Sequence, residues 1–305
     1  MSFTANIKEE VTRLEGNVLE YLAELSCIIR NNATIKEEIT ITVENNAVAR
    51  RIFKLIKSIY DVTPVITVRK RYNFNNNLSY ILKIKHKKEL ILKDLSIVID
   101  GVYQNIPKSY LINDEECLRA YLRGLFISTG SINDPKTSRY HLEFIVDNKE
   151  YALFLVELLN RFRLNSKVIN REKNYMVYIK EAEKISDFLR IINAYQAVMY
   201  FEDIRIYRDH KNMTNRLNNC EQANIDKIVQ TATNQLEYIK IIEEIVQEGI
   251  ENGEFYYGDV EAISAGIFGV TCSSLIYRLK RNREVDVETI YNGFINSVTR
   301  TLSKK

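Results

Sequence analysis

Hydrophobic and polar positions along the chain alternate between a helical period and a strand period, and the same order of periods occurs twice. From Leu22 an apolar helical stretch is followed by a strand-like alternation, a second helix and a pair of strands. From Leu118 the order helix, strand, helix, hairpin returns, roughly a hundred residues further along. A period of this length indicates a duplicated domain rather than a solenoid, and it predicts a mixed α+β fold.

The two copies also agree in detail. ITVENN in the first copy and FIVDNK in the second are each typical of a strand that ends in an acidic residue and an Asn that starts a helix. In both copies the predicted hairpin has a basic first strand and a Tyr-rich second strand. The repeat therefore extends through every element of the two halves.

Two similar halves usually pack about a pseudo-two-fold axis, so equivalent elements are expected to meet at the junction. The first helix of each half is apolar and carries small residues, which let two helix backbones approach closely. Gly124 is expected at this contact despite its helix cost of about 1 kcal/mol relative to Ala. Gly130 is expected just past the helix end in a left-handed conformation. The predicted helix-pair residues are Ala23, Ser26, Cys27, Ala120 and Gly124.

Length and composition narrow the class of protein. With 305 residues, 46% of them hydrophobic and 27% charged, the chain can form two or three ordinary cores. We find no apolar run of membrane-spanning length and no signal peptide, so a cytoplasmic protein without membrane contact is expected. The 4 cysteines are scattered without a CxxC pair and the 3 histidines are far apart. This spacing predicts free thiols in a reducing compartment, and neither a metal site nor a cofactor.

The net charge of +3 is small, but the charges are unevenly distributed. The segment 68–90 is strongly basic, with Glu89 as its one acid, and the segment 161–173 at the matching place in the second copy is also basic. The segment 243–261 has acids and no Lys or Arg. One basic run is usually a solvated surface, but two runs at equivalent places favour a polyanionic partner.

Several long stretches carry a resemblance to a known family. Two duplicated halves joined by a helix pair with the pattern L-x-G-x-x-x-x-x-G resemble the LAGLIDADG homing-endonuclease fold. More specifically, roughly residues 1–240 resemble the WhiA family of LAGLIDADG-derived DNA-binding regulators. The matching stretches include AELSCIIRNNATI, ENNAVARRIFKLIKSIYDV, YLRGLFISTGSINDPKTSRYHLEF, YIKEAEKISDFLRIINAYQAVMYFEDIRIYRD and NMTNRLNNCEQANIDKIVQTATNQLE.

The resemblance implies an architecture and a function. It implies LAGLIDADG-like repeats at 1–108 and 109–211, a linker or helix at 212–240, and an all-α domain at 241–305. It also implies a transcription regulator that binds double-stranded DNA, associated with the nucleoid and linked to cell division, chromosome segregation or sporulation. Other transcription proteins would be further partners.

In the nuclease relatives, the last acidic residue of each motif holds a divalent metal that assists phosphodiester cleavage. The equivalent positions in this chain are Asn32 and Thr129, and neither is a charged ligand for Mg²⁺. The resemblance therefore implies a DNA-binding protein without nuclease activity. The alternative is an active endonuclease that uses an unmatched acid, such as Glu24 or Asp134.

The curved sheets of the LAGLIDADG fold lie along the DNA, so the resemblance places basic side chains of the hairpins on phosphates. Asn73, Asn75 and Asn76 could contact bases, although Asn in a loop more often stabilises a turn. A second basic segment, 201–224, either contacts phosphates or is a polar linker. The expected DNA-binding residues of these segments are Arg69, Lys70, Arg71, Lys167, Arg171, Lys173, Arg205, Arg208, Lys211 and Arg216.

Two interpretations of the C-terminal segment stay open. In the first, residues 261–284 form a helix-turn-helix whose second helix presents Arg278, Lys280 and Arg281 to DNA, together with Ser273, Ser274 and Tyr277. In the second, GIENGEF, DVEAI and the apolar run after it resemble the C-terminal regulatory domain of TetR-type repressors. Residues 241–305 would then form a homodimer or bind a ligand, and a change at Phe268 would disturb that role.

Overall fold

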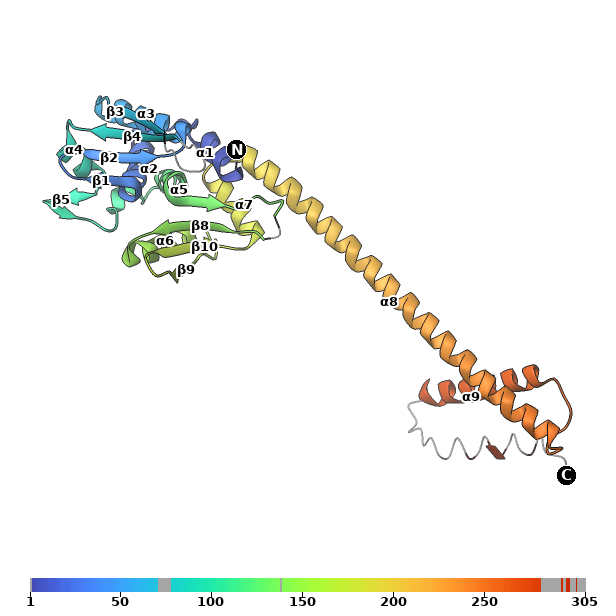
Figure 1. The fold of residues 1–305 in the computed structure, drawn as a ribbon. Helices are drawn as coiled ribbons and strands as arrows, with labels where there is room; N and C mark the ends of the chain where they lie inside the picture. Colours follow the sequence, from blue (N-terminus) through green and yellow to red (C-terminus); the bar gives the residue numbers. More distant parts are fainter. Residues whose placement is uncertain are drawn as a thin grey trace. The chain divides into compact units, whose positions relative to one another are not determined.

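The computed structural model describes residues 2–70, 78–137 and 139–280, together with positions 292, 295, 296 and 300 (Figure 1). The chain divides into two compact units, Met1–His210 (unit 1) and Lys211–Lys305 (unit 2). Arg71, Asn73, Asn75, Asn76 and Arg281, named above as candidate contacts, lie outside the described residues.

Unit 1 contains the two copies that the repeat predicts. Its first half comprises α1 (Phe3–Val11), α2 (Val18–Asn32), β1 (Ala33–Ile35), β2 (Ile39–Val43), α3 (Asn46–Tyr60), β3 (Val65–Lys70), β4 (Leu78–Ile84), α4 (Lys88–Asp94), β5 (Val98–Ile99) and β6 (Val102–Tyr103). Its second half comprises a short 3₁₀ turn (Ser109–Leu111), α5 (Glu115–Thr129), β7 (Gly130–Ile132), β8 (Leu142–Val146), α6 (Lys149–Arg161), β9 (Lys167–Asn170), β10 (Tyr175–Ile179) and α7 (Ala182–Ile191).

The two halves have the same sheet topology. Both four-stranded sheets are antiparallel, one in the order β1-β2-β4-β3 and the other in the order β7-β8-β10-β9. The duplicated α+β fold is therefore confirmed. The edge strands β1 and β7 were not predicted, because each has three residues that directly continue a helix. A strand this short carries too little alternation to separate it from the helix end.

Asn side chains start equivalent helices in the two halves, as the sequence predicts. Asn45 accepts hydrogen bonds from the backbone N–H groups of Ala47 and Val48, and Asn148 accepts one from that of Tyr151. Each bond satisfies a donor that the first turn of the helix leaves unpaired. These caps fix where α3 and α6 begin, and the two helices then cover one face of their own sheet.

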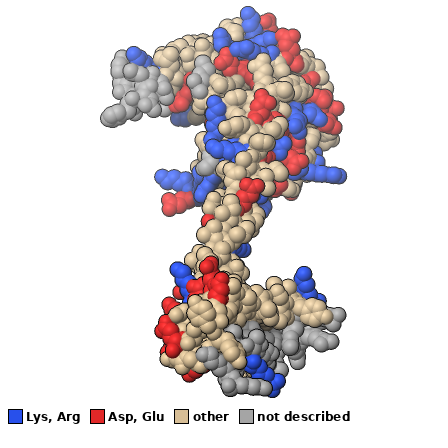
Figure 2. Space-filling view, turned by 90° about the vertical axis from the view of Figure 1, so that its right-hand side faces the viewer, with Lys and Arg blue, Asp and Glu red and all other residues tan. Residues whose placement is uncertain are grey.

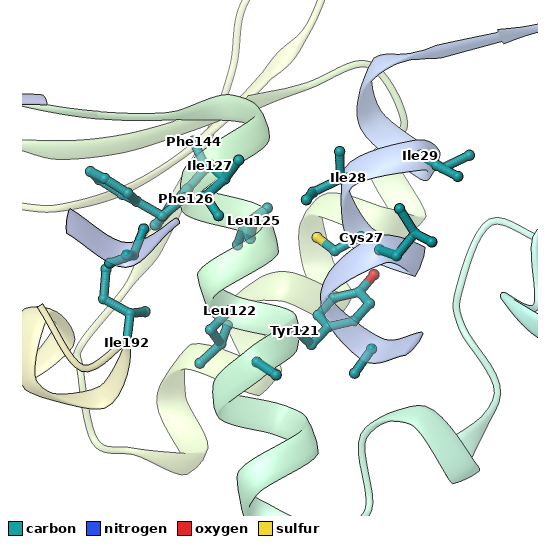
Figure 3. Packing of buried hydrophobic residues seen from close by; sticks show 14 of the residues in the cluster. Cys27, Ile28, Ile29, Tyr121, Leu122, Leu125, Phe126, Ile127, Phe144 and Ile192 are labelled. Atoms are coloured by element: carbon teal, nitrogen blue, oxygen red, sulfur yellow. The ribbon is translucent and has the colours of Figure 1, made fainter. Parts of the chain in front are cut away.

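Helices α2 and α5 pack side by side at the centre of unit 1 and run in the same direction (Figure 3). A Cβ atom on Gly124 would lie 2.5 Å from the carbonyl oxygen of Glu24 and 3.1 Å from Cβ of Cys27. Only a residue without a side chain allows this approach, which is the reason for a glycine in the middle of an apolar helix.

Gly130 differs from the prediction. Its backbone is extended, with φ −71° and ψ 138°, so it is not a left-handed helix cap. A Cβ atom there would lie 2.5 Å from a ring carbon of Phe126 and 2.7 Å from the Cα atom of the same residue. Gly130 is therefore required by close packing where the helix turns directly into β7.

Unit 2 is mainly helical in its described residues, with a non-helical connection at 252–259. Helix α8 (Tyr195–Glu251) begins in unit 1 and continues through the segment predicted to be a linker, so no break occurs at 240. Helix α9 (Val260–Lys280) is continuous, which contradicts a helix-turn-helix with its turn inside 261–280.

The expectation that the chain has no apolar run of membrane-spanning length is also wrong. Residues Val260–Tyr277 of α9 have a mean hydropathy of 1.4, and by length and composition alone they are long and apolar enough to cross a membrane.

Candidate nucleic-acid interface

Each four-stranded sheet buries one face against helices and leaves the other open. In the first sheet the buried face carries Ile39, Ile41, Leu82 and Ile84. Residues paired directly across antiparallel strands point to the same side, and side chains alternate along a strand. The register therefore assigns Thr34, Thr40, Thr42, Val65, Thr67, Arg69, Ile81 and Lys83 to the open face.

The second sheet has the same arrangement. Leu142, Phe144, Val177 and Ile179 are buried against the helices. The register places Ser131, Glu143, Ile145, Lys167, Ile169, Met176 and Tyr178 on the open face. Arg171 follows β9 and contacts the open face, since its guanidinium lies 3.6 Å from the carboxylate of Glu143. Arg69 and Arg171 thus occupy equivalent places on the two sheets.

The two open faces lie at the same end of the helix pair. Helices α2 and α5 run in the same direction, and each leads straight into the first strand of its own sheet, β1 or β7 (Figure 3). The last helical residues, Asn32 and Thr129, mark this end. A partner that spans this end of unit 1 can therefore contact both sheets.

The open face of the first sheet carries several cations that the sequence pattern did not single out. A cavity of about 630 Å³ on this face is lined by three lysines, two glutamates and two threonines: Lys36, Lys83, Lys85, Glu37, Glu38, Thr34 and Thr40. The ammonium group of Lys83 hydrogen-bonds the Glu38 carboxylate and lowers its pKa, and the charge of Lys85 acts in the same direction. The alternation along β4, which places Ile81, Lys83 and position 85 on one side, is the signal that could have identified them.

An aromatic pair was also missed on the second sheet. The rings of His141 and Tyr178 stack with centroids 5.9 Å apart, and the Lys180 ammonium lies 4.9 Å from the centre of the Tyr178 ring. His141 Nε2 also lies 3.2 Å from a carboxylate oxygen of Glu143. The alternation along β8 and β10 brings these groups together.

The structure separates the basic residues that were grouped by sequence. Arg69 and Lys70 are both exposed, but successive strand residues point to opposite sides, so Arg69 alone of this pair belongs to the open face. Lys167 and Arg171 lie on the open face of the second sheet, and Lys173 is exposed in the turn between β9 and β10. A run of consecutive cations is therefore a poor guide to a strand surface.

Two further predicted contacts have partners within unit 1. Arg205 is paired with Glu202 at 2.7 Å, which raises the pKa of Arg205. Arg208 donates to the carbonyl oxygens of Pro135 and Thr137 at 2.8 and 2.6 Å and stacks over the Tyr140 ring at 4.6 Å. These contacts hold the loop before β8, so the structure gives both arginines a packing role.

The remaining predicted contacts belong to unit 2. Lys211 and Arg216 are exposed on α8, and Lys280 is exposed at the end of α9. The backbone of Arg278 is helical. Since α9 has no turn, Arg278 and Lys280 do not lie on a separate recognition helix as predicted.

In the nuclease alternative Glu24 would hold the metal ion, but the structure buries this carboxylate. Glu24 is 0% exposed and accepts two hydrogen bonds from Arg51, at 2.8 and 2.7 Å, and one from Arg123 at 3.0 Å. The two guanidinium groups occupy this carboxylate. Asp134 instead accepts a hydrogen bond from the backbone of Lys136 in an exposed turn. Among the described residues, no group of three His, Cys, Asp or Glu side chains could hold a metal ion.

The predicted helix-pair residues are all buried, although their contacts differ. Cys27 and Gly124 face each other, while the Ser26 hydroxyl donates to the carbonyl oxygen of Leu95, 2.7 Å away. In the view of Figure 2, Lys and Arg are interspersed with Asp and Glu over unit 1 and do not gather in one basic patch.

Comparisons with known proteins agree with this fold. The WhiA N-terminal LAGLIDADG-like domain matches residues 20–98, the WhiA LAGLIDADG-like domain matches 118–211, and the WhiA C-terminal HTH domain matches 214–254. The probable cell division protein WhiA of Staphylococcus aureus (strain JH9) is 44% identical over 257 residues, which are 83% of this chain and 81% of the relative. The chain belongs to the WhiA family.

Solved WhiA structures share the fold. Full-length WhiA from Thermatoga maritima aligns over 100% of both chains with a TM-score of 0.60 and 20% identity. The N-terminal LAGLIDADG domain of WhiA aligns over 63% of this chain and 90% of that chain, with a TM-score of 0.52 and 23% identity. The duplicated LAGLIDADG-like fold of the first 210 residues is thus a WhiA fold.

The match to the WhiA HTH domain corrects the place that sequence reasoning gave to it. The match lies at 214–254, mostly in the segment interpreted as a linker or helix, and it extends beyond residue 240, where the expected resemblance ends. In the structure residues 214–251 belong to the single helix α8. The segment related to the HTH domain therefore ends close to the point where α8 ends.

Proposed function

We propose that this WhiA-family chain is a non-catalytic regulator that binds double-stranded DNA across the open faces of its two sheets. The observation that carries the proposal is the pair of equivalent faces at one end of the helix pair, each with an arginine at the same place. The names of the curated relatives connect the proposal to cell division. Regulation of transcription, a link to sporulation, association with the nucleoid and further protein partners are parts of the same proposal.

The electrostatics of the open faces support this binding mode. The first sheet presents Arg69, Lys83 and Lys85, and the second presents Lys167 and Arg171. Cations that neutralise phosphates release counterions, so affinity falls as salt rises. Threonine hydroxyls on the first sheet add neutral donors that fit phosphate oxygens.

The chemistry at the end of the helix pair supports binding without cleavage. Asn32 and Thr129 occupy the positions at which the fold would need hard anionic ligands, and the Thr129 hydroxyl donates to the carbonyl oxygen of Leu125 at 3.3 Å. Glu24 is enclosed by arginines. We therefore expect DNA binding that does not depend on Mg²⁺ and does not nick plasmid DNA.

The proposal is tested with the full chain and a labelled random-sequence duplex in fluorescence anisotropy at two salt concentrations. Arg69→Glu with Lys85→Glu should weaken binding and reduce the salt slope by about 2, because two phosphate contacts are lost. The matched control is Lys54→Glu with Lys57→Glu, which makes the same charge change on exposed residues of α3, behind the sheet. Equal weakening by both pairs, or no binding by the parent chain, would overturn the proposal.

A second candidate function, ligand binding by unit 2, is favoured by one observation. A cavity of about 840 Å³ lies between α8 and α9, lined by Tyr238, Ile242, Val246, Phe268 and Leu275 among others. This volume lies in the range of small-molecule sites, and such sites are mostly apolar with a few polar groups. Here Asn234 and Gln235 at one end of the lining would orient a largely apolar ligand with a neutral polar end.

The competing occupant of this cavity is a second copy of the chain. 1-Anilinonaphthalene-8-sulfonate is a suitable probe, and its fluorescence should rise with saturation on the full chain. Cys272→Phe, which fills the cavity, should abolish that rise, whereas Cys220→Phe on the exposed part of α8 should not. A dimer in sedimentation that Phe268→Ala dissociates, without saturable dye binding, would replace the ligand by a second copy.

A further inference from the structure

The open face of the second sheet contains a charged group that the first sheet lacks at the same place. Glu143 on β8 lies 3.2 Å from Nε2 of His141 and 3.6 Å from a guanidinium nitrogen of Arg171. Its side chain is 23% exposed, and that of Arg171 is 48% exposed. An acid, an arginine and a histidine thus meet on a surface that, under the proposed function, faces DNA.

The equivalent place on the first sheet is neutral. Ala33 pairs with Ile41 as Gly130 pairs with Phe144, so the register makes Thr40 the counterpart of Glu143. The side chain of Arg69, the counterpart of Arg171, makes no hydrogen bond or ion pair with any residue that the structure describes, and its backbone pairs with Ser79. The same backbone therefore carries a lone arginine on one sheet and an arginine paired with a carboxylate on the other.

This difference has a physical consequence for a polyanion. A carboxylate facing phosphates repels them, so Glu143 lowers the general affinity of the second sheet for DNA. A carboxylate can, however, accept a hydrogen bond from the amino group of cytosine, and arginine can donate two hydrogen bonds to guanine. The ion pair with Arg171 holds the two groups within reach of one base pair or of adjacent pairs.

Neighbouring side chains support this arrangement. The ring of Tyr178 lies directly across from Glu143 in the strand register and stacks on His141. Arg171 also lies 2.7 Å from the sulfur of Met176, on the same face. These contacts limit the orientations of Arg171 and His141, and a pre-oriented group loses less conformational entropy when it binds.

We propose that the two sheets divide the work of DNA recognition, with Glu143 and Arg171 of the second sheet reading a G·C pair. The first sheet then supplies mainly phosphate contacts through Arg69 and its lysines. This inference rests on the proposed DNA-binding function and names the part of the interface that gives it sequence preference.

The test is selection from a random duplex library by the full chain, followed by sequencing and by anisotropy on the selected duplex. The parent chain should enrich at least one G·C position. Glu143→Gln should reduce the preference at that position by about tenfold, which is typical for one base contact. Its salt slope should not fall, because Glu143 itself makes no phosphate contact and its removal leaves the charge of Arg171 unneutralised.

The matched control is Glu38→Gln, which removes an acid that is also paired with a cation, Lys83, on the open face of the first sheet. It should keep the selected sequence. Arg171→Lys keeps the charge but loses the planar fork, so it should reduce the G·C preference and keep the salt slope. Thermal denaturation of each variant separates loss of recognition from loss of folding.

The outcomes separate the inference from the function on which it rests. If the parent chain binds no duplex, the proposed function fails. If it binds but enriches no G·C position, or if Glu143→Gln and Arg171→Lys keep the preference of the parent, the division of work between the sheets is wrong and DNA binding still stands.

Discussion

The two halves of unit 1 share one backbone plan and differ in their buried polar chemistry. Helices α2 and α5 each have fifteen residues, so Glu24 and Tyr121 are equivalent, as are Cys27 and Gly124. Glu24 is enclosed by two guanidinium groups, whereas the Tyr121 hydroxyl lies 2.9 Å from the hydroxyl of Tyr151. Duplication thus preserved helix positions and strand order while the partners of each buried polar group changed.

The difference between the halves shows what a pseudo-two-fold core requires. Where the two equivalent helices meet, the facing residues must both be small, or their shapes must be complementary. Here Gly124 faces Cys27. Away from the axis the surroundings of equivalent residues differ, because α3 offers Arg51 to Glu24 while α6 offers Tyr151 to Tyr121. Glu24 is also bonded by Arg123 of the second half, and the Tyr151 hydroxyl also accepts from Asn31 of the first, so some of these buried contacts cross between the halves.

The largest expected effect in this comparison is at Glu24. Glu24→Ala leaves Arg51 and Arg123 buried without their carboxylate, which typically costs about 3–5 kcal/mol of unfolding free energy. Urea denaturation of the full chain, followed by circular dichroism, measures the loss. Glu9→Ala removes a carboxylate whose partner, Arg13, is largely exposed, and it serves as the control with little effect. A loss at Glu24 no larger than at Glu9 would mean that the buried pair contributes nothing.

The next largest effect on stability is expected at Gly124, where the helices of the two halves are in contact. Gly124→Ala places a Cβ atom 2.5 Å from a backbone oxygen of α2, so the helices must move apart at a cost of about 1–3 kcal/mol. Gly266→Ala in α9 meets no atom within 4 Å and should be stabilising or neutral, since alanine favours helices. Thermal denaturation of the two variants distinguishes close packing from helix propensity. A stabilised Gly124→Ala variant would contradict the close contact.

The buried hydroxyl pair Tyr121–Tyr151 and the neighbouring Cys27 thiol predict that the stability of the fold falls at alkaline pH. Burial raises the pKa of Cys27 from 9.0 to about 12 and raises the pKa of Tyr121 and Tyr151 well above the usual value. The folded state therefore keeps protons that the unfolded chain releases. Stability should be complete below about pH 9 and should fall as pH rises toward about 12.

Tyr121→Phe tests this pH dependence. The variant should lose about 1 kcal/mol at neutral pH, typical of one hydrogen bond, and should show a shallower alkaline decline than the parent. Urea denaturation across this pH range gives both values. Tyr256→Phe, at an exposed tyrosine of unit 2, should leave the decline unchanged. If the unfolding free energies of the parent and of the Tyr121→Phe variant fell equally with rising pH, ionisation of this hydroxyl would not contribute to the alkaline decline.

The smallest effects concern the open faces. Arg69→Ala should reduce the salt slope of duplex binding by about 1, the value for one phosphate contact. Arg171→Ala should reduce it less, because Glu143 already neutralises part of that charge. Anisotropy titrations over a range of salt concentrations compare the two variants directly. Equal reductions would show that the ion pair opens fully on DNA and would remove this difference between the sheets.

Much of unit 1 could be predicted from the sequence because its signals are local. The change between helical and strand periods, the Asn caps at the starts of α3 and α6, and the repeat itself all lie within short segments. The short strands β1 and β7 were missed, since three residues contain too little pattern. In unit 2 the apolar run of α9 was recognised as a helix, but nothing local distinguished one continuous helix from two.

The candidate interface shows the limit of local information. The sequence by itself determined the duplicated fold and the close contact of the helix pair at Gly124. Only the tertiary structure decided that Arg69 and Lys70 point to opposite sides, that Arg208 holds a loop, and that Glu24 is buried between arginines. Periods and caps depend on neighbours along the chain, whereas strand register and burial depend on contacts between residues far apart in sequence, which no local pattern specifies.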